Sequence, residues 1–95
     1  SEFFNAALSQ ALAGILAQNP LLDLIEFDIF TLSTDIFLDP LSFGFMNATD
    51  GCYSAFVEPG GTVCMDPDAY VSWDGFHPTT AAHEAIAARM AAQVV

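Results

Sequence analysis

The sequence predicts an α/β fold, but only part of one. The expected order is helix, strand, helix, loop and helix, and the single expected strand, residues 21–30, is apolar on both faces. Strands of that kind lie inside parallel sheets and need neighbours on each edge. In addition, 54% of the 95 residues are hydrophobic and only 14% are charged, which is more apolar surface than so short a domain buries by itself. We therefore expect a portion of a larger α/β domain.

The first helix is predicted over residues 2–18. Phe4, Leu8, Leu12 and Ile15 follow helical spacing, and Asn19-Pro20 ends the pattern. Residues 3–22 carry no charge, but six polar or proline residues interrupt them, so we predict no transmembrane segment. These are Asn5, Ser9, Gln10, Gln18, Asn19 and Pro20.

The remaining elements follow in order. In residues 21–30, Ile25, Phe27 and Ile29 share one face of the expected strand. A short helix is predicted over residues 31–38, where Asp39-Pro40 stops it, and residues 41–68 are expected to be a loop. A short apolar run at residues 70–73 leads to Thr79, a good N-cap, and residues 80–94 are predicted to form the closing helix.

The charge balance excludes some partners. The sequence has 12 acidic residues against one basic residue, Arg89, for a formal net charge of −11. Nucleic acids and anionic membranes both require Lys and Arg to neutralise phosphate, so neither is expected to bind. We interpret the acidity as a solvated exterior.

Two cysteines, Cys52 and Cys64, lie in a stretch rich in Gly, Pro and Asp. They lack the spacing and the additional ligands of a zinc site. We favour a disulfide, which is worth about 3 kcal/mol in the chain-entropy model and implies an oxidising compartment. Two unrelated buried thiols are the alternative. The sequence begins at Ser1 and shows no signal peptide, so we expect export to have been directed by residues removed earlier.

The sharpest local motif is an aspartate three residues before a histidine, Asp74 and His77, in a turn that leads into the closing helix. At this spacing a carboxylate oxygen can reach one imidazole nitrogen, fix the tautomer and leave the other nitrogen to take a proton from a nucleophile. Pro78 disfavours helical backbone at His77. By spacing alone, a surface turn is the alternative interpretation.

The wider sequence resembles the GDSL (SGNH) esterase/lipase family. The resemblance lies in residues 73–79, WDGFHPT, with Ala81-Ala82-His83 and Ile86-Ala87 after them, and in an upstream stretch typical of secreted members: residues 44–47, Cys52, Cys64, Asp66-Pro67 and residues 68–70. It implies a flavodoxin-like three-layer α/β/α sandwich and a Ser-His-Asp enzyme that cleaves carboxylic esters without a cofactor. Asp74 would be the orienting acid and His77 the general base.

The resemblance also implies that residues 1–95 are the C-terminal portion of a single hydrolase domain. The family's serine lies in an N-terminal GDS block and its other oxyanion donors in middle blocks, and none of these blocks occurs here. We expect a secreted enzyme whose partner is its own N-terminal portion, present as a second chain after proteolytic nicking, with a small ester or lipid as substrate. The isolated chain should be inactive.

Several alternatives remain open. His83 is expected to be a partly buried packing residue, although Asp74, His77 and His83 could form a divalent-metal site. Asp66 and Asp68 could bind calcium, but a turn with solvated carboxylates is favoured. Four aromatic residues are expected in the core and could instead line an acyl pocket: Phe43, Phe45, Phe56 and Trp73. The rival function is a non-enzymatic, acidic, disulfide-stapled module that binds a protein through its apolar surface.

Overall fold

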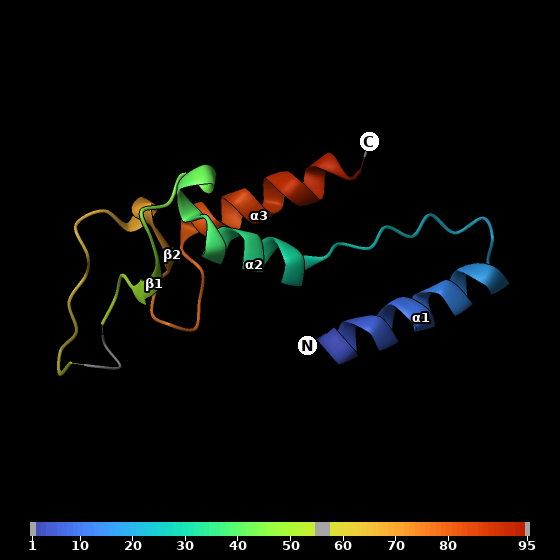
Figure 1. The fold of residues 1–95 in the computed structure, drawn as a ribbon, viewed down its shortest axis with the longest axis horizontal. Coiled ribbons are helices and arrows are strands. Elements are labelled where there is room, and N and C mark those ends of the chain that lie inside the picture. The colour runs from blue at the N-terminus through green and yellow to red at the C-terminus, as the bar shows by residue number, and fades with distance from the viewer. Residues whose placement is uncertain (1, 55–57, 95) are drawn as a thin grey trace.

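The computed structural model describes residues 2–54 and 58–94, so Phe56 lies outside the described residues. Within these described residues there are three α-helices, a two-stranded parallel sheet and two short 3-10 helices, a mixed α/β arrangement (Figure 1). The elements are α1 (Glu2–Gln18), α2 (Ile29–Leu38), η1 (Pro40–Phe43), β1 (Asn47–Gly51), η2 (Pro67–Ala69), β2 (Tyr70–Ser72) and α3 (Thr80–Ala92).

The three helices lie near their predicted ranges, although α2 begins at Ile29 rather than at residue 31 and α3 ends at Ala92 rather than at residue 94. α1 has the predicted bounds. At the start of α2, the side chain of Asp28 accepts a hydrogen bond from the backbone N–H of Thr31 at 2.9 Å, which satisfies one of the free donors of a helix N-terminus. Pro40 follows α2 and opens η1. At α3 the predicted cap, Thr79, accepts from the backbone N–H of Ala82 at 3.2 Å.

The predicted strand over residues 21–30 is wrong. Residues 22–28 are an extended linker without regular secondary structure, and Ile29 already belongs to α2 (Figure 1). A strand exists only where a neighbour accepts and donates its backbone hydrogen bonds, and within the described residues the sheet consists of β1 and β2 alone. The alternating apolar pattern is present, but no described segment pairs with residues 22–28.

One strand of the sheet, β1, lies in the segment for which a loop is predicted, residues 41–68. β1 and β2 run parallel, with Asn47 opposite Tyr70 and Gly51 opposite Ser72, and the register is irregular between these pairs. β2 falls within the apolar run predicted at residues 70–73. The connection between the two strands contains the Cys52–Cys64 loop and η2.

A small core joins α2, α3 and the sheet. Phe45 is 2% exposed and packs with Leu32 and Ile36 of α2 and Ala82 of α3, while Val71 of β2 covers it in part. These contacts place the start of α3 next to β2, and the turn between those two elements carries the Asp74–His77 motif.

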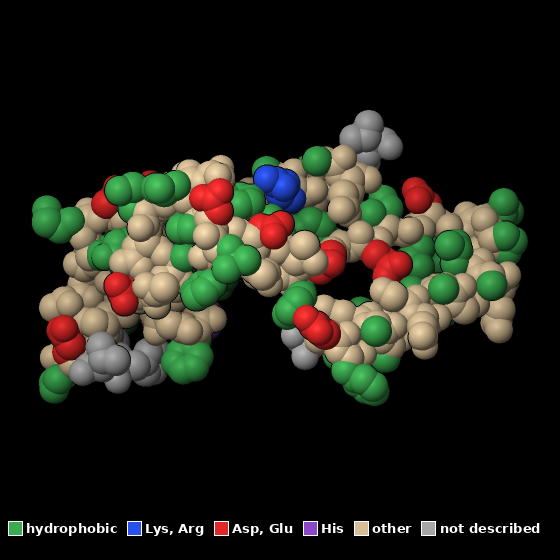
Figure 2. Space-filling view, in the orientation of Figure 1, with side chains coloured by type: hydrophobic (Ala, Val, Ile, Leu, Met, Phe, Trp, Pro, Cys, Tyr) green, Lys and Arg blue, Asp and Glu red, His purple; other side chains and the backbone are tan. Residues whose placement is uncertain are grey.

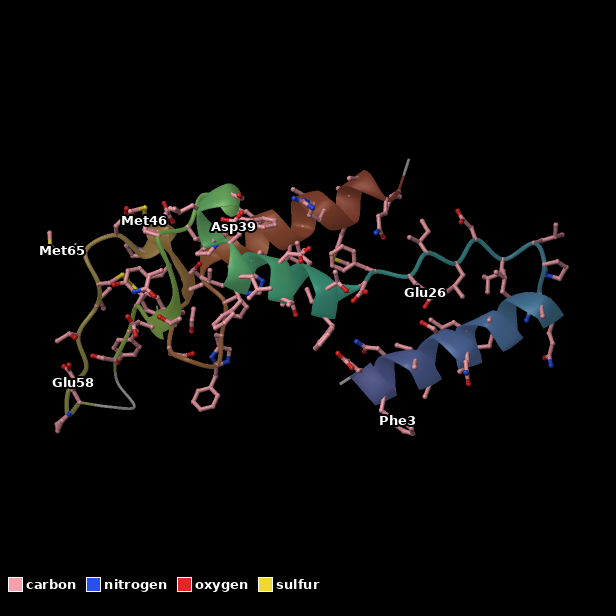
Figure 3. All side chains as sticks on the ribbon, in the orientation of Figure 1. Phe3, Glu26, Asp39, Met46, Glu58 and Met65 are labelled. Carbon is pink, nitrogen blue, oxygen red and sulfur yellow. A yellow bond between two sulfur atoms is a disulfide. The ribbon has the colours of Figure 1, made fainter. Side chains whose placement is uncertain are left out.

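α1 stands apart from this core. It has no buried residue, and it lies beside the extended linker, to which it is joined by a hydrogen bond from Ser9 Oγ to Glu26 Oε1 at 2.7 Å (Figures 1 and 3). Phe3 points away from the molecule on α1, and Met65 does so at the opposite end (Figure 3). Hydrophobic side chains therefore reach the surface along the whole length of the molecule (Figure 2).

The resulting shape is elongated. The radius of gyration is 16.9 Å and the extents are 53 × 26 × 21 Å, whereas a compact chain of this length has a radius of gyration of about 12 Å. No helix among the described residues combines the length and the apolar character that a membrane crossing requires.

Candidate active site

The seven residues between β2 and α3 form a closed turn. The N–H of Trp73 donates to the carbonyl oxygen of His77 at 2.7 Å, and the N–H of Gly75 donates to Ser72 Oγ at 2.8 Å. Gly75 has a φ of +95°, a backbone conformation that residues with a Cβ rarely adopt. An isolated bridge between Ser72 and Pro78 closes the base of the turn, so its backbone is held at both ends.

Asp74 organises the inside of this turn. Its Oδ1 accepts hydrogen bonds from the N–H of Phe76 at 2.9 Å and from the N–H of His77 at 2.8 Å. Its Oδ2 lies 2.8 Å from Nδ1 of His77. The Asp74 side chain is only 11% exposed, whereas that of His77 is 74% exposed. The carboxylate is thus enclosed by the turn, and the imidazole projects from it.

These contacts determine the charge of Asp74 and the tautomer of His77. The backbone hydrogen bond from Phe76, helped by the hydrogen bonds from the His77 side chain and backbone, lowers the pKa of Asp74 to about 2. An ionised carboxylate can only accept hydrogen bonds, so Nδ1 of His77 carries the proton in this contact. The lone pair of the neutral ring is then on Nε2. This arrangement can accept a proton at Nε2 and stabilise the resulting imidazolium.

The disulfide loop supports the turn from one side. Cys52 and Cys64 form the predicted disulfide, and the N–H of Cys52 donates to the carbonyl oxygen of Ser72 at 3.0 Å. The next residue, Tyr53, donates its N–H to the carbonyl oxygen of Trp73 and stacks on the Trp73 ring with centroids 5.5 Å apart. The loop therefore holds the backbone of Ser72 and Trp73, the two residues that precede Asp74.

β1 also packs closely against the turn. A Cβ at Gly51 would lie 3.2 Å from the backbone carbonyl carbon of Asp74 and 3.2 Å from the nitrogen of Gly75. The absence of a side chain at Gly51 is what allows β1 to approach the Asp74 backbone this closely.

The other predicted site residues do not converge on the turn. His83 is exposed on α3, so its predicted partial burial is wrong; the neighbouring elements do not cover that face of the helix. In the part of the chain that the structure describes, no three or more His, Cys, Asp or Glu side chains are grouped as metal ligands. Asp66 and Asp68 are both exposed, and Asp66 accepts from the N–H of Ala69 through its carbonyl oxygen.

The proposed aromatic cluster is also dispersed. Phe45 is in the core as expected, Phe43 packs beside it and lies under the Arg89 guanidinium at 5.1 Å, and Trp73 stacks on Tyr53. The aromatic ring that the sequence reasoning overlooked is that of Phe76, which is exposed next to His77. Its signal was its place inside the WDGFHPT motif, where it directly precedes His77.

A separate cavity of about 220 Å³ lies between α2 and α3, away from the turn. It is lined by Phe27, Asp28, Thr31, Leu32, Asp35, Arg89 and Gln93. Neither Asp74 nor His77 contributes to it.

Comparison with known proteins agrees with the motif. The family model for GDSL-like lipase/acylhydrolase matches residues 2–90. The Arabidopsis thaliana protein named GDSL esterase/lipase At1g28590 is 34% identical over 98 residues, which cover 90% of this chain and 24% of that protein. GDSL esterase/lipase At5g45910, from the same plant, is 30% identical over 100 residues, which cover 92% of this chain and 27% of its own length.

A shorter match is closer in sequence. GDSL esterase/lipase At1g29660, also from Arabidopsis thaliana, is 39% identical over 62 residues, covering 58% of this chain and 17% of that protein. The chain spans about a quarter of the length of the curated relatives it matches. Because the family model covers nearly the whole sequence, the chain belongs to the GDSL-like lipase/acylhydrolase family.

Proposed function

We propose that this chain is the C-terminal portion of a secreted carboxylic ester hydrolase and that it supplies the base and the orienting acid of a Ser-His-Asp triad. The observation that carries the proposal is the 2.8 Å contact between Asp74 Oδ2 and His77 Nδ1, in which the carboxylate is enclosed and the imidazole exposed. Such a pair is built to activate a nucleophile that approaches Nε2 from outside this chain.

The proposed reaction follows from the tautomer of His77. Nε2 takes the proton of a serine hydroxyl as the serine oxygen attacks the ester carbonyl carbon. The tetrahedral intermediate collapses, the bond between the carbonyl carbon and the leaving oxygen breaks, and the alcohol departs with the proton from the imidazolium. Water then attacks the acyl-serine while Nε2 accepts its proton, and the carboxylic acid is released as the serine regains a proton. Asp74 holds the ring in position throughout.

The rest of the domain is proposed to come from an N-terminal portion, either on the same polypeptide or as an associated chain. The exposed apolar surface, the unpaired linker at residues 22–28 and the match to about a quarter of each relative support this proposal. A flavodoxin-like α/β/α sandwich would pair residues 22–28 within its parallel sheet and cover both faces. The Cys52–Cys64 disulfide supports an oxidising, extracytoplasmic location.

The decisive variant is His77→Ala in the protein that also contains the N-terminal portion. We expect kcat for a soluble ester to fall by roughly 10³-fold or more, because general-base catalysis and stabilisation of the imidazolium are both lost, while the circular dichroism spectrum is retained. His83→Ala is the matched control, since His83 is exposed on α3 and lies outside the turn. Ester turnover that survives His77→Ala would refute the catalytic role.

A rival function is favoured by one observation, the extent of exposed apolar surface, which also suits a module that binds another protein. A fluorophosphonate probe separates the two functions, because it labels only an activated serine. Labelling of the purified protein that is abolished by His77→Ala supports the hydrolase. Absence of labelling, with a folded protein, supports the binding module.

A further inference from the structure

Phe76 is a large apolar side chain that the fold leaves in solvent at the candidate active site. The residue is 79% exposed. Most other strongly exposed apolar residues lie on α1, on the linker or on the outer faces of the helices, where the missing part of the domain would cover them. Phe76 instead lies within the turn, between the two residues of the catalytic pair.

The backbone of Phe76 is held by the same carboxylate as His77. Asp74 Oδ1 accepts from the N–H of Phe76 at 2.9 Å and from the N–H of His77 at 2.8 Å. The positive φ of Gly75 and the hydrogen bond from Trp73 to His77 fix the chain on either side. These contacts restrain the backbone of Phe76, so its Cα stays next to His77.

The chemistry of this position limits what the ring can recognise. A phenyl side chain offers no hydrogen-bond donor or acceptor, so it gains free energy only by covering hydrocarbon. The surrounding chain carries a formal net charge of −11, which disfavours an anionic ligand next to the ring. The group that suits this position is the hydrocarbon of a neutral ester. It would lie near the Phe76 ring when the ester carbonyl carbon is within reach of a serine beside Nε2.

We propose that Phe76 contacts the hydrocarbon portion of a neutral ester substrate and sets the preference of the enzyme for longer chains. This inference rests on the proposed function. Both the acyl chain and the alcohol chain extend from the carbonyl carbon, and the same apolar contact would serve either. The two are distinguished by lengthening one chain at a time.

The test compares Phe76→Ala with Phe76→Leu in the protein that contains the N-terminal portion. The acyl arm uses p-nitrophenyl acetate, butyrate and octanoate, and the alcohol arm uses methyl, butyl and octyl acetate. We expect Phe76→Ala to lower kcat/KM for the longest ester of one arm by about tenfold and for the shortest by less than about twofold, in line with the loss of a few buried methylene equivalents. The decrease in kcat/KM should come mainly from a higher KM, and Phe76→Leu should restore most of the lost kcat/KM.

Phe37→Ala is the matched control, because Phe37 is an exposed phenylalanine on α2 outside the turn. It should leave the ratio of long-chain to short-chain kcat/KM unchanged. A merely structural role for Phe76 would lower kcat for every ester by the same factor, and a ratio that is unchanged in both arms would overturn the inference while leaving the hydrolase intact. A wild-type protein without ester turnover or fluorophosphonate labelling would overturn the proposed function itself.

Discussion

At the scale of single residues, the site depends on one carboxylate with three hydrogen-bond donors. Asp74 accepts from two backbone N–H groups and from the imidazole of His77. The interaction between the two side chains could be anticipated from their spacing, because every donor lies within three residues of Asp74. The exposure of His83 and of Phe76 could not, since it depends on which neighbours pack against them.

The first prediction concerns the titration of Asp74. Its pKa is lowered from 3.8 to about 2, first by the backbone hydrogen bond from Phe76 and then by the contacts with His77. The folded state therefore favours the ionised form, so this contribution to stability is complete above about pH 4 and is lost as the pH falls towards 2. Titration of the Asp74 carboxyl ¹³C resonance by NMR should show its midpoint near pH 2.

His77→Ala is a useful control for this measurement. It removes the side-chain contact but keeps the backbone hydrogen bond from Phe76, which has the largest effect. The midpoint should therefore rise in the variant while staying below 3.8. A midpoint at or above 3.8 in the wild-type protein would mean that the turn does not hold the carboxylate as described.

At the scale of elements, the N-terminus of α3 was predicted correctly because it is a local feature. Thr79 is buried, accepts from the N–H of Ala82 and donates its hydroxyl to the carbonyl oxygen of Tyr70 at 2.7 Å. One side chain thus caps the helix and ties it to β2, at the end of the turn that carries Asp74 and His77.

Removing the Thr79 hydroxyl should weaken both connections. Thr79→Val keeps the shape of the side chain, loses the cap and leaves the Tyr70 carbonyl without that donor, so we expect the free energy of unfolding to fall by about 1–3 kcal/mol. Urea denaturation followed by circular dichroism measures the change. Thr79→Ser keeps the hydroxyl and should lower the free energy of unfolding clearly less. Equal losses in the two variants would show that the methyl group, and not the hydroxyl, carries the effect.

The strands were not predictable in the same way. Residues 21–30 have the alternation of a covered strand, yet residues 22–28 are unpaired. β1 has the sequence NATDG, in which only Thr49 is of a type that strands favour, yet it pairs with β2 beside the disulfide. Strand formation depends on a partner segment, and the partner is specified elsewhere in the chain or outside it.

At the scale of the whole molecule, stability should be uneven. α1 has no buried residue, and most of the stability of a helix in a protein comes from the packing of one face against the rest of the fold. In hydrogen exchange on the 95-residue chain, the amides of α1 should therefore exchange much faster than those of Cys52, Trp73 and Thr79, which donate within the sheet and turn region. Equal protection of α1 and α3 would contradict this picture.

Adding the proposed N-terminal portion should change that pattern. If it covers the exposed apolar surface, the amides of α1 and of residues 22–28 should become protected, whereas the turn around Asp74 should change little. The same experiment thus compares elements that are complete within this chain with elements that need a partner.

The sequence by itself determined the family, the approximate positions of the helices with the Thr79 cap, the disulfide pair and the closeness of Asp74 to His77. Each of these depends on residues near one another in the chain or on a short closed loop, where few conformations compete and the side chains involved satisfy each other directly. Tertiary structure decided the strands, the exposure of His83 and Phe76, and the packing of the disulfide loop against the turn that carries Asp74 and His77. Those features depend on distant segments, because backbone pairing and burial gain free energy only when a second surface is present.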